Sequence, residues 1–163
     1  MLLNRRALLA AVVGMSVTTL PALAQSGDDA IAFIKSVYRL NALWRDVAAN
    51  RSQYLTPDFV AAMNENDKYN SEPGYAVAYD PLVQTRDWGV LQNFKLTIES
   101  ANPPTATVRA SFINLNRPTL VRFDLVKTTD GWRIADLHNP AGASLRQEYE
   151  DLNREARAAS AKN

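Results

Sequence analysis

The stretch that decides the fold spans residues 121–134 and reads VRFDLVKTTDGWRI. In its first half, the apolar residues Val121, Phe123 and Leu125 alternate with charged neighbours, which is typical of a strand with one buried face. The Thr-Asp-Gly triplet that ends at Gly131 is a tight-turn signal, and apolar alternation resumes after it. We therefore expect two antiparallel strands joined by a hairpin, in a sheet that is covered on one side.

Two further strands are expected before this hairpin. Apolar residues alternate with polar ones over residues 94–99 and again over residues 107–112. Asn-Pro-Pro at residues 102–104 separates these two segments, and Asn-Arg-Pro at residues 116–118 separates the second from the hairpin; both triplets are turn signals. The sequence thus predicts a four-stranded antiparallel meander.

A long helix is expected before the sheet. Ser26 is its predicted N-cap, because two aspartates follow and would meet the positive end of the helix dipole. Apolar residues then recur at helical spacing until the pattern stops near Asn50. The apolar stripe is wide enough for a helix that lies across a sheet.

Two shorter helices complete the prediction. Thr56 is the expected cap of the second helix and Pro57 its first residue. Residues 64–81 are polar and irregular, so we expect a loop there. Ser144 and Gln147 form a capping box for a last helix. The residues expected to face inward on that helix are Leu145, Tyr149 and Leu152.

Residues 1–24 have the three parts of a secretory signal peptide. Arginines stand at positions 5 and 6, an apolar run covers residues 7–20, and a small-x-small cleavage site ends at Ala24. The apolar run is shorter than the roughly 20 residues that span a bilayer. The paired arginines leave the twin-arginine and the general secretory routes open. We expect an exported protein, periplasmic or secreted, with residues 25–163 as a single domain; a buried N-terminal helix is the alternative.

The composition argues against several kinds of partner. Removal of the leader takes away two of the 18 basic residues and none of the 17 acidic ones, which leaves a net charge of −1. A near-neutral chain lacks the basic face that nucleic acids and anionic membranes require. With one histidine and no cysteine, it also has too few ligands for zinc or copper. We expect no metal, no cofactor, no nucleic acid and no membrane span.

Two motifs carry a resemblance to known proteins. Residues 130–137, DGWRIADL, are similar to the last-strand pattern of the nuclear-transport-factor-2-like superfamily. Residues 79–82, YDPL, together with residues 86–88, RDW, resemble an uncharacterised family of small exported bacterial proteins, many of them lipoproteins. The resemblance covers most of residues 27–140. This chain departs from the lipoproteins in lacking an anchoring cysteine, and it adds a helix after Pro140.

The resemblance implies a cystatin-like α+β cone, in which a curved antiparallel sheet packs on the long N-terminal helix. In that superfamily, ligands enter the cone between the long helix and the concave face of the sheet. Some members are dehydratases or isomerases that use Asp and His there, whereas many others only bind ligands or dimerise. The fold therefore leaves the function open.

One acid–base pair is the catalytic candidate. If Trp132 and Ile134 face the core, strand alternation places Asp136 and His138 on the same side. A carboxylate beside an imidazole is a general-base arrangement, and Asp87 is the third catalytic candidate. The alternative is that His138 ends the strand in solvent while Asp136 caps a backbone turn.

Polar and aromatic residues near the expected cone form the ligand-binding candidates, namely Tyr38, Tyr79, Asp80, Asp87 and Trp88. The aromatic residues either make a recognition surface or anchor the packing. We expect Asp80 to cap a short helix that begins at Pro81. Asp87 is expected at the pocket rim within a hydrogen-bond network, with Arg86 or a cluster of backbone amides as its partner.

The polar face of the sheet is a second candidate surface, where related folds dimerise. The residues expected to form cross-strand charge pairs there are Glu99, Arg109, Arg122 and Asp124. We expect a small periplasmic binding or interaction protein without enzymatic activity, whose partner is a small molecule or a periplasmic protein. A dehydratase- or isomerase-type enzyme that uses the Asp136–His138 pair in the cone pocket is the alternative.

Overall fold

The computed structural model describes residues 20–39, 44–69, 71, 74–87 and 89–162. The chain forms five helices and four strands over these residues. In chain order they are α1 (Leu20–Arg39), α2 (Trp44–Ala49), α3 (Arg51–Tyr54), α4 (Pro57–Asn66), β1 (Gln92–Asn102), β2 (Thr105–Asn114), β3 (Arg117–Thr128), β4 (Gly131–His138) and α5 (Leu145–Ser160). Most of the expected signal peptide lies outside the described residues, and its last part, from Leu20, belongs to α1.

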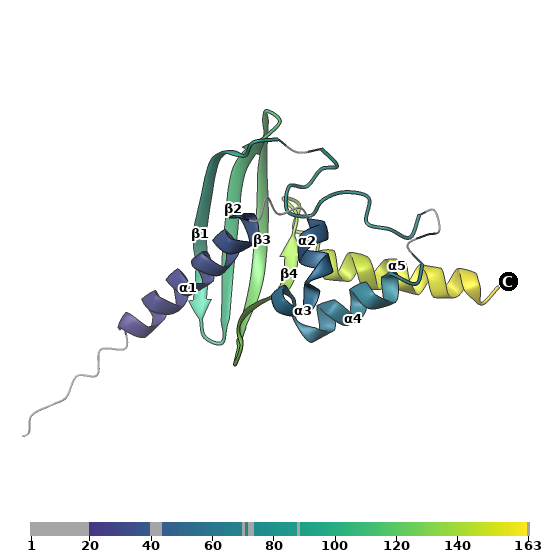
Figure 1. Ribbon diagram of the computed structural model, residues 1–163, viewed down its shortest axis with the longest axis horizontal. Helices are drawn as coiled ribbons and strands as arrows, with labels where there is room; N and C mark the ends of the chain where they lie inside the picture. Colours follow the sequence, from purple (N-terminus) through teal and green to yellow (C-terminus); the bar gives the residue numbers. More distant parts are fainter. Residues whose placement is uncertain (1–19, 40–43, 70, 72–73, 88, 163) are drawn as a thin grey trace, which may run out of the picture.

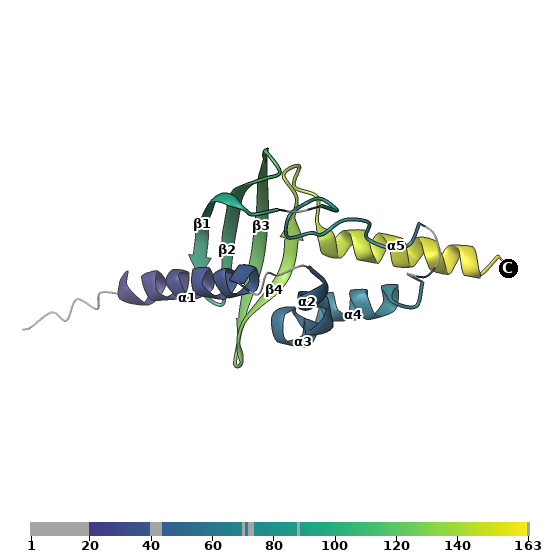
Figure 2. The same ribbon diagram turned by 45° about the horizontal axis from the view of Figure 1, so that its top comes forward.

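The four strands form one antiparallel sheet in the order β1-β2-β3-β4, which confirms the predicted meander and the α+β class. Helix α1 runs across one face of the sheet, over β1 and β2 (Figure 1). The other helices gather beyond β4, where α4 and α5 lie side by side and extend away from the sheet (Figures 1 and 2). The molecule is therefore elongated along the direction of α5.

Aromatic side chains fill the space between α1 and the sheet. The ring centroid of Tyr38 lies 6.0 Å from that of Phe112 and 6.1 Å from that of Phe123. Ile34 and Val37 of α1 are fully buried against the same face. Because burial of a large apolar side chain contributes roughly 1.5–3 kcal/mol, this layer stabilises the packing of α1 on the sheet.

The first helix differs from its prediction at both ends. It begins at Leu20, so Ser26 lies inside α1, where its hydroxyl is buried and has no hydrogen-bond partner among the described residues. Alanine-rich sequence favours the helix upstream of Ser26, and Pro21 in the first turn removes no helical hydrogen bond. Residues 44–49 form the separate helix α2.

The predicted starts of the other two long helices are confirmed. Pro57 is the first residue of α4 and Thr56 has the extended backbone of an N-cap, although its side chain makes no capping bond. Ser144 caps α5 by accepting a hydrogen bond from the Gln147 backbone N–H at 2.9 Å. Helix α4 continues to Asn66, so the irregular segment begins after that residue instead of at residue 64.

The inward face of α5 is partly as predicted. Leu145 and Tyr149 are buried, whereas Leu152 is only half-buried. The next residue, Asn153, takes the buried position, and its Nδ2 donates to the Ala62 carbonyl of α4 at 2.9 Å. A hydrogen bond of Asn153 therefore joins α5 to α4, whereas the apolar pattern predicted that Leu152 would make the buried contact.

A β-bulge in β4 overturns the predicted orientation of the catalytic pair. Leu125 of β3 pairs with Ile134 of β4, and the neighbouring Asp124 pairs with Asp136. Ala135 therefore has no partner on β3 and is the extra residue of the bulge. An inserted residue exchanges the two faces of a strand beyond it. Asp136 and His138 therefore point to the face opposite α1, while Leu137 takes the core position.

No helix in the described ranges is long and apolar enough to cross a bilayer.

Candidate functional site

The Asp136 carboxylate connects the end of β4 to the start of α5 through hydrogen bonds. Its Oδ1 accepts hydrogen bonds from the backbone N–H groups of Leu137 at 2.8 Å and Arg146 at 3.1 Å. Its Oδ2 accepts from the Ser144 hydroxyl at 2.5 Å. A carboxylate beside the first turn of a helix also interacts favourably with the helix dipole. The geometry thus agrees with the turn-capping alternative for this residue.

His138 lies in a polar network on the same face. Its Nε2 is 2.7 Å from Oδ2 of Asp124 and 3.9 Å from Oδ2 of Asp136. Its Nδ1 lies 3.3 Å from the Gly142 carbonyl, which fixes the orientation of the ring. The structure thus brings Asp136 and His138 together, but away from the space between α1 and the sheet. Among the described residues no group of three or more His, Cys, Asp or Glu side chains is arranged to hold a metal ion.

Asp80 connects two segments that are distant in the sequence. Its Oδ1 accepts from the Leu82 backbone N–H at 2.9 Å, and its Oδ2 from the Trp44 backbone N–H at 2.8 Å. Residues 81–84 form a turn instead of the expected short helix. Burial raises the pKa of Asp80, and the backbone N–H groups of Trp44 and Leu82 act in the opposite direction. Both carboxylate oxygens therefore serve the fold.

The two tyrosines proposed for ligand binding are also bonded within the protein. The Tyr38 hydroxyl donates to the Leu82 carbonyl at 3.0 Å, and burial raises its pKa. The Tyr79 hydroxyl donates to Oε2 of Glu148 at 2.7 Å, which holds the 75–80 segment against α5. Burial, followed by this hydrogen bond, raises the pKa of Tyr79. Both residues act as packing anchors, and Trp88 lies outside the described residues.

Asp87 is the described ligand-binding candidate that borders a cavity. A pocket of about 280 Å³ lies between the turn at residues 83–87 and the β2–β3 hairpin, and we call it the Asp87 pocket. Its lining consists of Val83, Gln84, Thr85, Asp87, Asn114, Leu115, Arg117 and Thr119. Neither expected partner of the Asp87 carboxylate, Arg86 or a group of backbone amides, is found among the described residues, and Arg86 Nε donates instead to the Ala78 carbonyl at 2.7 Å. The position of Asp87 at a pocket rim is as expected.

Sequence reasoning did not identify a larger groove of about 520 Å³ between α3–α4 and the β3–β4 hairpin. Its lining consists of Ser52, Leu55, Pro57, Val60, Ala61, Asn64, Thr128, Asp130 and Arg133, and we call it the α4 groove. One wall is apolar and the other carries charged side chains. The available signal was Val60, an apolar residue of α4 beside the buried positions of Phe59 and Met63.

The charged residues of the open sheet face form the predicted cross-strand pair in one of two cases. Arg109 Nη1 lies 3.1 Å from Oε1 of Glu99 on the neighbouring strand, so this cross-strand pair is confirmed. Arg122 Nε lies 3.9 Å from Oδ1 of Asp124, and both residues belong to β3. That second pair runs along a strand, and the closer partners of the Asp124 carboxylate are His138 Nε2 at 2.7 Å and the Thr107 hydroxyl at 3.3 Å.

Comparison with known proteins gives one match. No family model matches the chain, and no curated protein matches it either. A solved structure of the phospholipid-binding protein from Ralstonia solanacearum, in complex with a phospholipid, is similar to it at 21% sequence identity. The match covers 79% of this chain and 76% of that one with a TM-score of 0.34. Because the TM-score is so low, this likeness carries no argument about the fold or the ligand of this chain.

Proposed function

We propose that this chain is an exported binding protein, without enzymatic activity, that holds a small amphiphilic anion in the α4 groove. The observation that carries the proposal is the pairing of an apolar wall with a guanidinium group in one cavity of about 520 Å³. Cavities of roughly 300–1,000 Å³ with apolar walls and a few placed polar groups are typical small-molecule sites.

The apolar wall comes from the junction of α3 and α4. Leu55 is 2% exposed and forms the floor, while Pro57, Val60 and Ala61 line the side. The chain is held here by β4, because the Thr56 backbone N–H donates to the Ile134 carbonyl at 3.0 Å. A ligand that covers this wall removes apolar surface from water, at about 25 cal/mol per Å².

Arg133 supplies the polar end of the site. Its Nη1 donates to the backbone carbonyls of Trp132 at 3.0 Å and Asp130 at 3.4 Å, which holds the side chain against the hairpin. Nε and Nη2 have no partner within the described part of the chain and are available to an anion. The neighbouring Asp130 carboxylate disfavours a highly charged headgroup, so a monoanion such as a carboxylate or sulfonate fits best.

Export and the cone-shaped fold belong to the same proposal. The signal-peptide pattern of residues 1–24 supports export to the periplasm. The packing of α1 across an antiparallel sheet supports a nuclear-transport-factor-2-like arrangement. We place the ligand in the α4 groove and not under α1, because Tyr38, Phe112 and Phe123 occupy that space.

The test uses protein recovered from the periplasm of expressing cells, and its intact mass checks the cleavage site. The probe is 8-anilinonaphthalene-1-sulfonate, an aromatic monoanion that fluoresces in apolar sites, and dodecanoate is the competitor. We expect the probe to bind and dodecanoate to displace it. Arg133→Gln should weaken the probe about tenfold or more, since hydrogen bonds to charged groups contribute about 1.5–3 kcal/mol.

Matched variants locate the binding. Ala61 lines the groove on α4, whereas Ala158 is exposed on α5 away from it. Ala61→Arg should abolish displaceable binding, and Ala158→Arg should leave it unchanged. Arg146→Gln, at a half-exposed arginine of α5, is the control for charge. Equal probe affinity in Ala61→Arg and wild type would rule out the α4 groove as the site.

A further inference from the structure

The Asp87 pocket has two walls that are built from distant parts of the chain and joined by one buried side chain. Asn114, at the end of β2, is 2% exposed. Its Oδ1 accepts from the Gly89 backbone N–H at 3.0 Å, and its Nδ2 donates to the Asp87 carbonyl at 3.3 Å. The segment that carries Asp87 is therefore held against the β2–β3 hairpin.

Strained backbone lies on both walls of this pocket. Gln84 has a φ of +59° and Leu115 a φ of +48°, and neither residue is a glycine. A non-glycine residue in the left-handed region costs roughly 1–2 kcal/mol. Leu115 is also 54% exposed, so its own burial does not offset that cost. At Leu115 the positive φ belongs to the two-residue turn of the β2–β3 hairpin, which Asn116 with a φ of +64° completes. Gln84 lies outside that hairpin, and strain of this kind concentrates at ligand sites.

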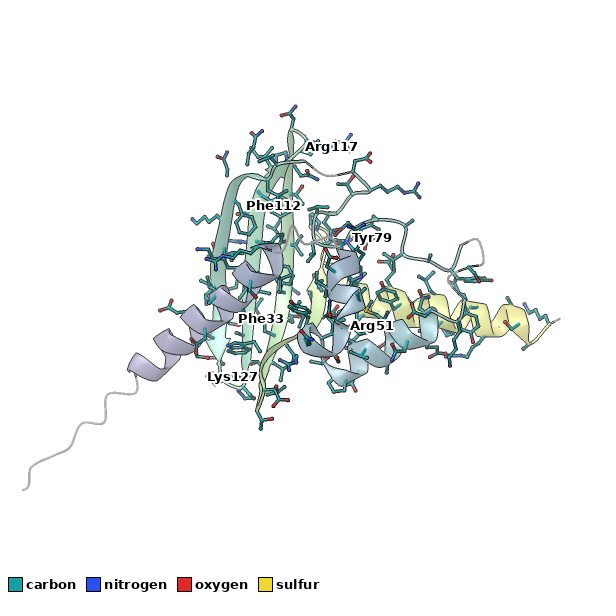
Figure 3. The ribbon with its side chains drawn as sticks, in the orientation of Figure 1. Phe33, Arg51, Tyr79, Phe112, Arg117 and Lys127 are labelled. Atoms are coloured by element: carbon teal, nitrogen blue, oxygen red, sulfur yellow. The ribbon has the colours of Figure 1, made fainter. Side chains whose placement is uncertain are left out.

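Two opposite charges border the same cavity without pairing. The Asp87 carboxylate and the Arg117 guanidinium are exposed, and neither has a hydrogen bond or ion pair among the described residues. Figure 3 shows Arg117 at the end of the sheet opposite Lys127. A ligand between these groups meets an anion on one wall and a cation on the other.

We infer that the Asp87 pocket binds a free α-amino acid with an apolar side chain. Asp87 would hold the ammonium group and Arg117 the carboxylate, in a fork geometry that suits carboxylates. Val83 and Leu115 line the pocket beside these charges and provide an apolar surface for the ligand side chain. This site is separate from the α4 groove and does not rest on the function proposed for it.

The experiment compares three probes that differ in charge, namely L-leucine, N-acetyl-L-leucine and L-leucinamide. The acetyl compound lacks the ammonium group, and the amide lacks the carboxylate. Binding is followed by NMR shifts of backbone amides. We expect L-leucine to shift the Gly89 amide, which is hydrogen-bonded to Asn114. Each analogue should bind at least tenfold more weakly, as should Asp87→Asn and Arg117→Gln.

Control variants use charged residues away from the pocket. Asp28→Asn alters an exposed aspartate of α1, and Arg45→Gln alters an arginine of α2 whose side chain is 79% exposed. Both should bind L-leucine like wild type, and so should Ala61→Arg, which blocks the α4 groove. Equal binding of all three probes would overturn the zwitterion inference. If about 10 mM L-leucine causes no shift of the Gly89 amide, any binding is weaker than millimolar. That result would overturn the site itself.

Discussion

Replacement of Asp80 tests whether a side chain proposed for ligand binding instead holds the fold together. Asp80→Ala removes the acceptors of two backbone N–H groups, those of Trp44 and Leu82, which lie at 2.8 Å and 2.9 Å from the carboxylate. Each part-buried donor that loses its partner costs about 1–3 kcal/mol. The free energy of unfolding should therefore fall by about 2–6 kcal/mol.

Asp80→Asn should remove only one of these two hydrogen bonds. The amide oxygen can replace one carboxylate oxygen, but the amide nitrogen presents a donor to the second N–H group. About half the loss, roughly 1–3 kcal/mol, is expected from the single lost bond. The measurement is urea unfolding followed by tryptophan fluorescence, with an unchanged m-value as the sign that the unfolded state is unaffected.

The pH dependence of the same variants has a defined sign. Burial raises the pKa of Asp80 above its ordinary value, so the folded state binds a proton more tightly than the unfolded state does. The stability from this group is then present below the unfolded pKa of about 3.9 and is lost as pH rises through the folded pKa. The advantage of wild type over Asp80→Asn should thus be larger near pH 3.5 than at pH 7.

Two results would refute this reasoning. A loss below about 1 kcal/mol in Asp80→Ala would show that neither hydrogen bond matters to the fold. An advantage of wild type that grows with pH would show that the backbone hydrogen bonds outweigh burial. Asp28→Ala, at an exposed aspartate of α1, is the control and should stay within about 0.5 kcal/mol of wild type.

The other predictions concern the contacts that hold α5 and β4. Tyr79→Phe removes the hydrogen bond to Glu148 and should lower the free energy of unfolding by about 1 kcal/mol in urea. The loss should be complete below the unfolded tyrosine pKa of about 10 and should shrink as the pH rises above that value toward the raised pKa of folded Tyr79. Ser144→Ala removes the N-cap of α5 and a donor to Asp136, and should cost about 1–2 kcal/mol, measured by thermal and urea unfolding. Deletion of Ala135 removes the extra residue, so Asp136 follows Ile134 in strict alternation, still opposite Asp124 and still pointing away from the core; the variant should remain folded in circular dichroism, as should Ala135→Gly. Loss of the folded state in the deletion variant would contradict the assigned bulge.

The sheet and the starts of α4 and α5 could be predicted because their signals are local. Apolar alternation over residues 121–126 and the Gly131 turn identify a hairpin without knowledge of any partner segment. Pro57 at the first helical position and Ser144 three residues before Gln147 mark helix starts in the same way. The structure confirms all of these features.

The candidate site could be predicted only in part. The sequence identified Asp87 and its rim position, but not its cavity partner Arg117, because the two residues come from different walls. The α4 groove escaped prediction altogether, since it forms where α4 faces a hairpin about 70 residues later in the chain. A cavity is a property of two surfaces, and either surface alone has the composition of ordinary exposed chain.

The amino-acid sequence by itself determined the number and order of the strands and the first residues of α4 and α5, because propensity, periodicity and capping act within a few residues. Only the tertiary structure decided which way Asp136 and His138 point. One extra residue, Ala135, exchanges the two faces of β4, and the register against β3 sets its position. Leu137 is buried in the core in their place. The expected acid–base pair therefore lies on the opposite face, where Asp136 is hydrogen-bonded to the start of α5.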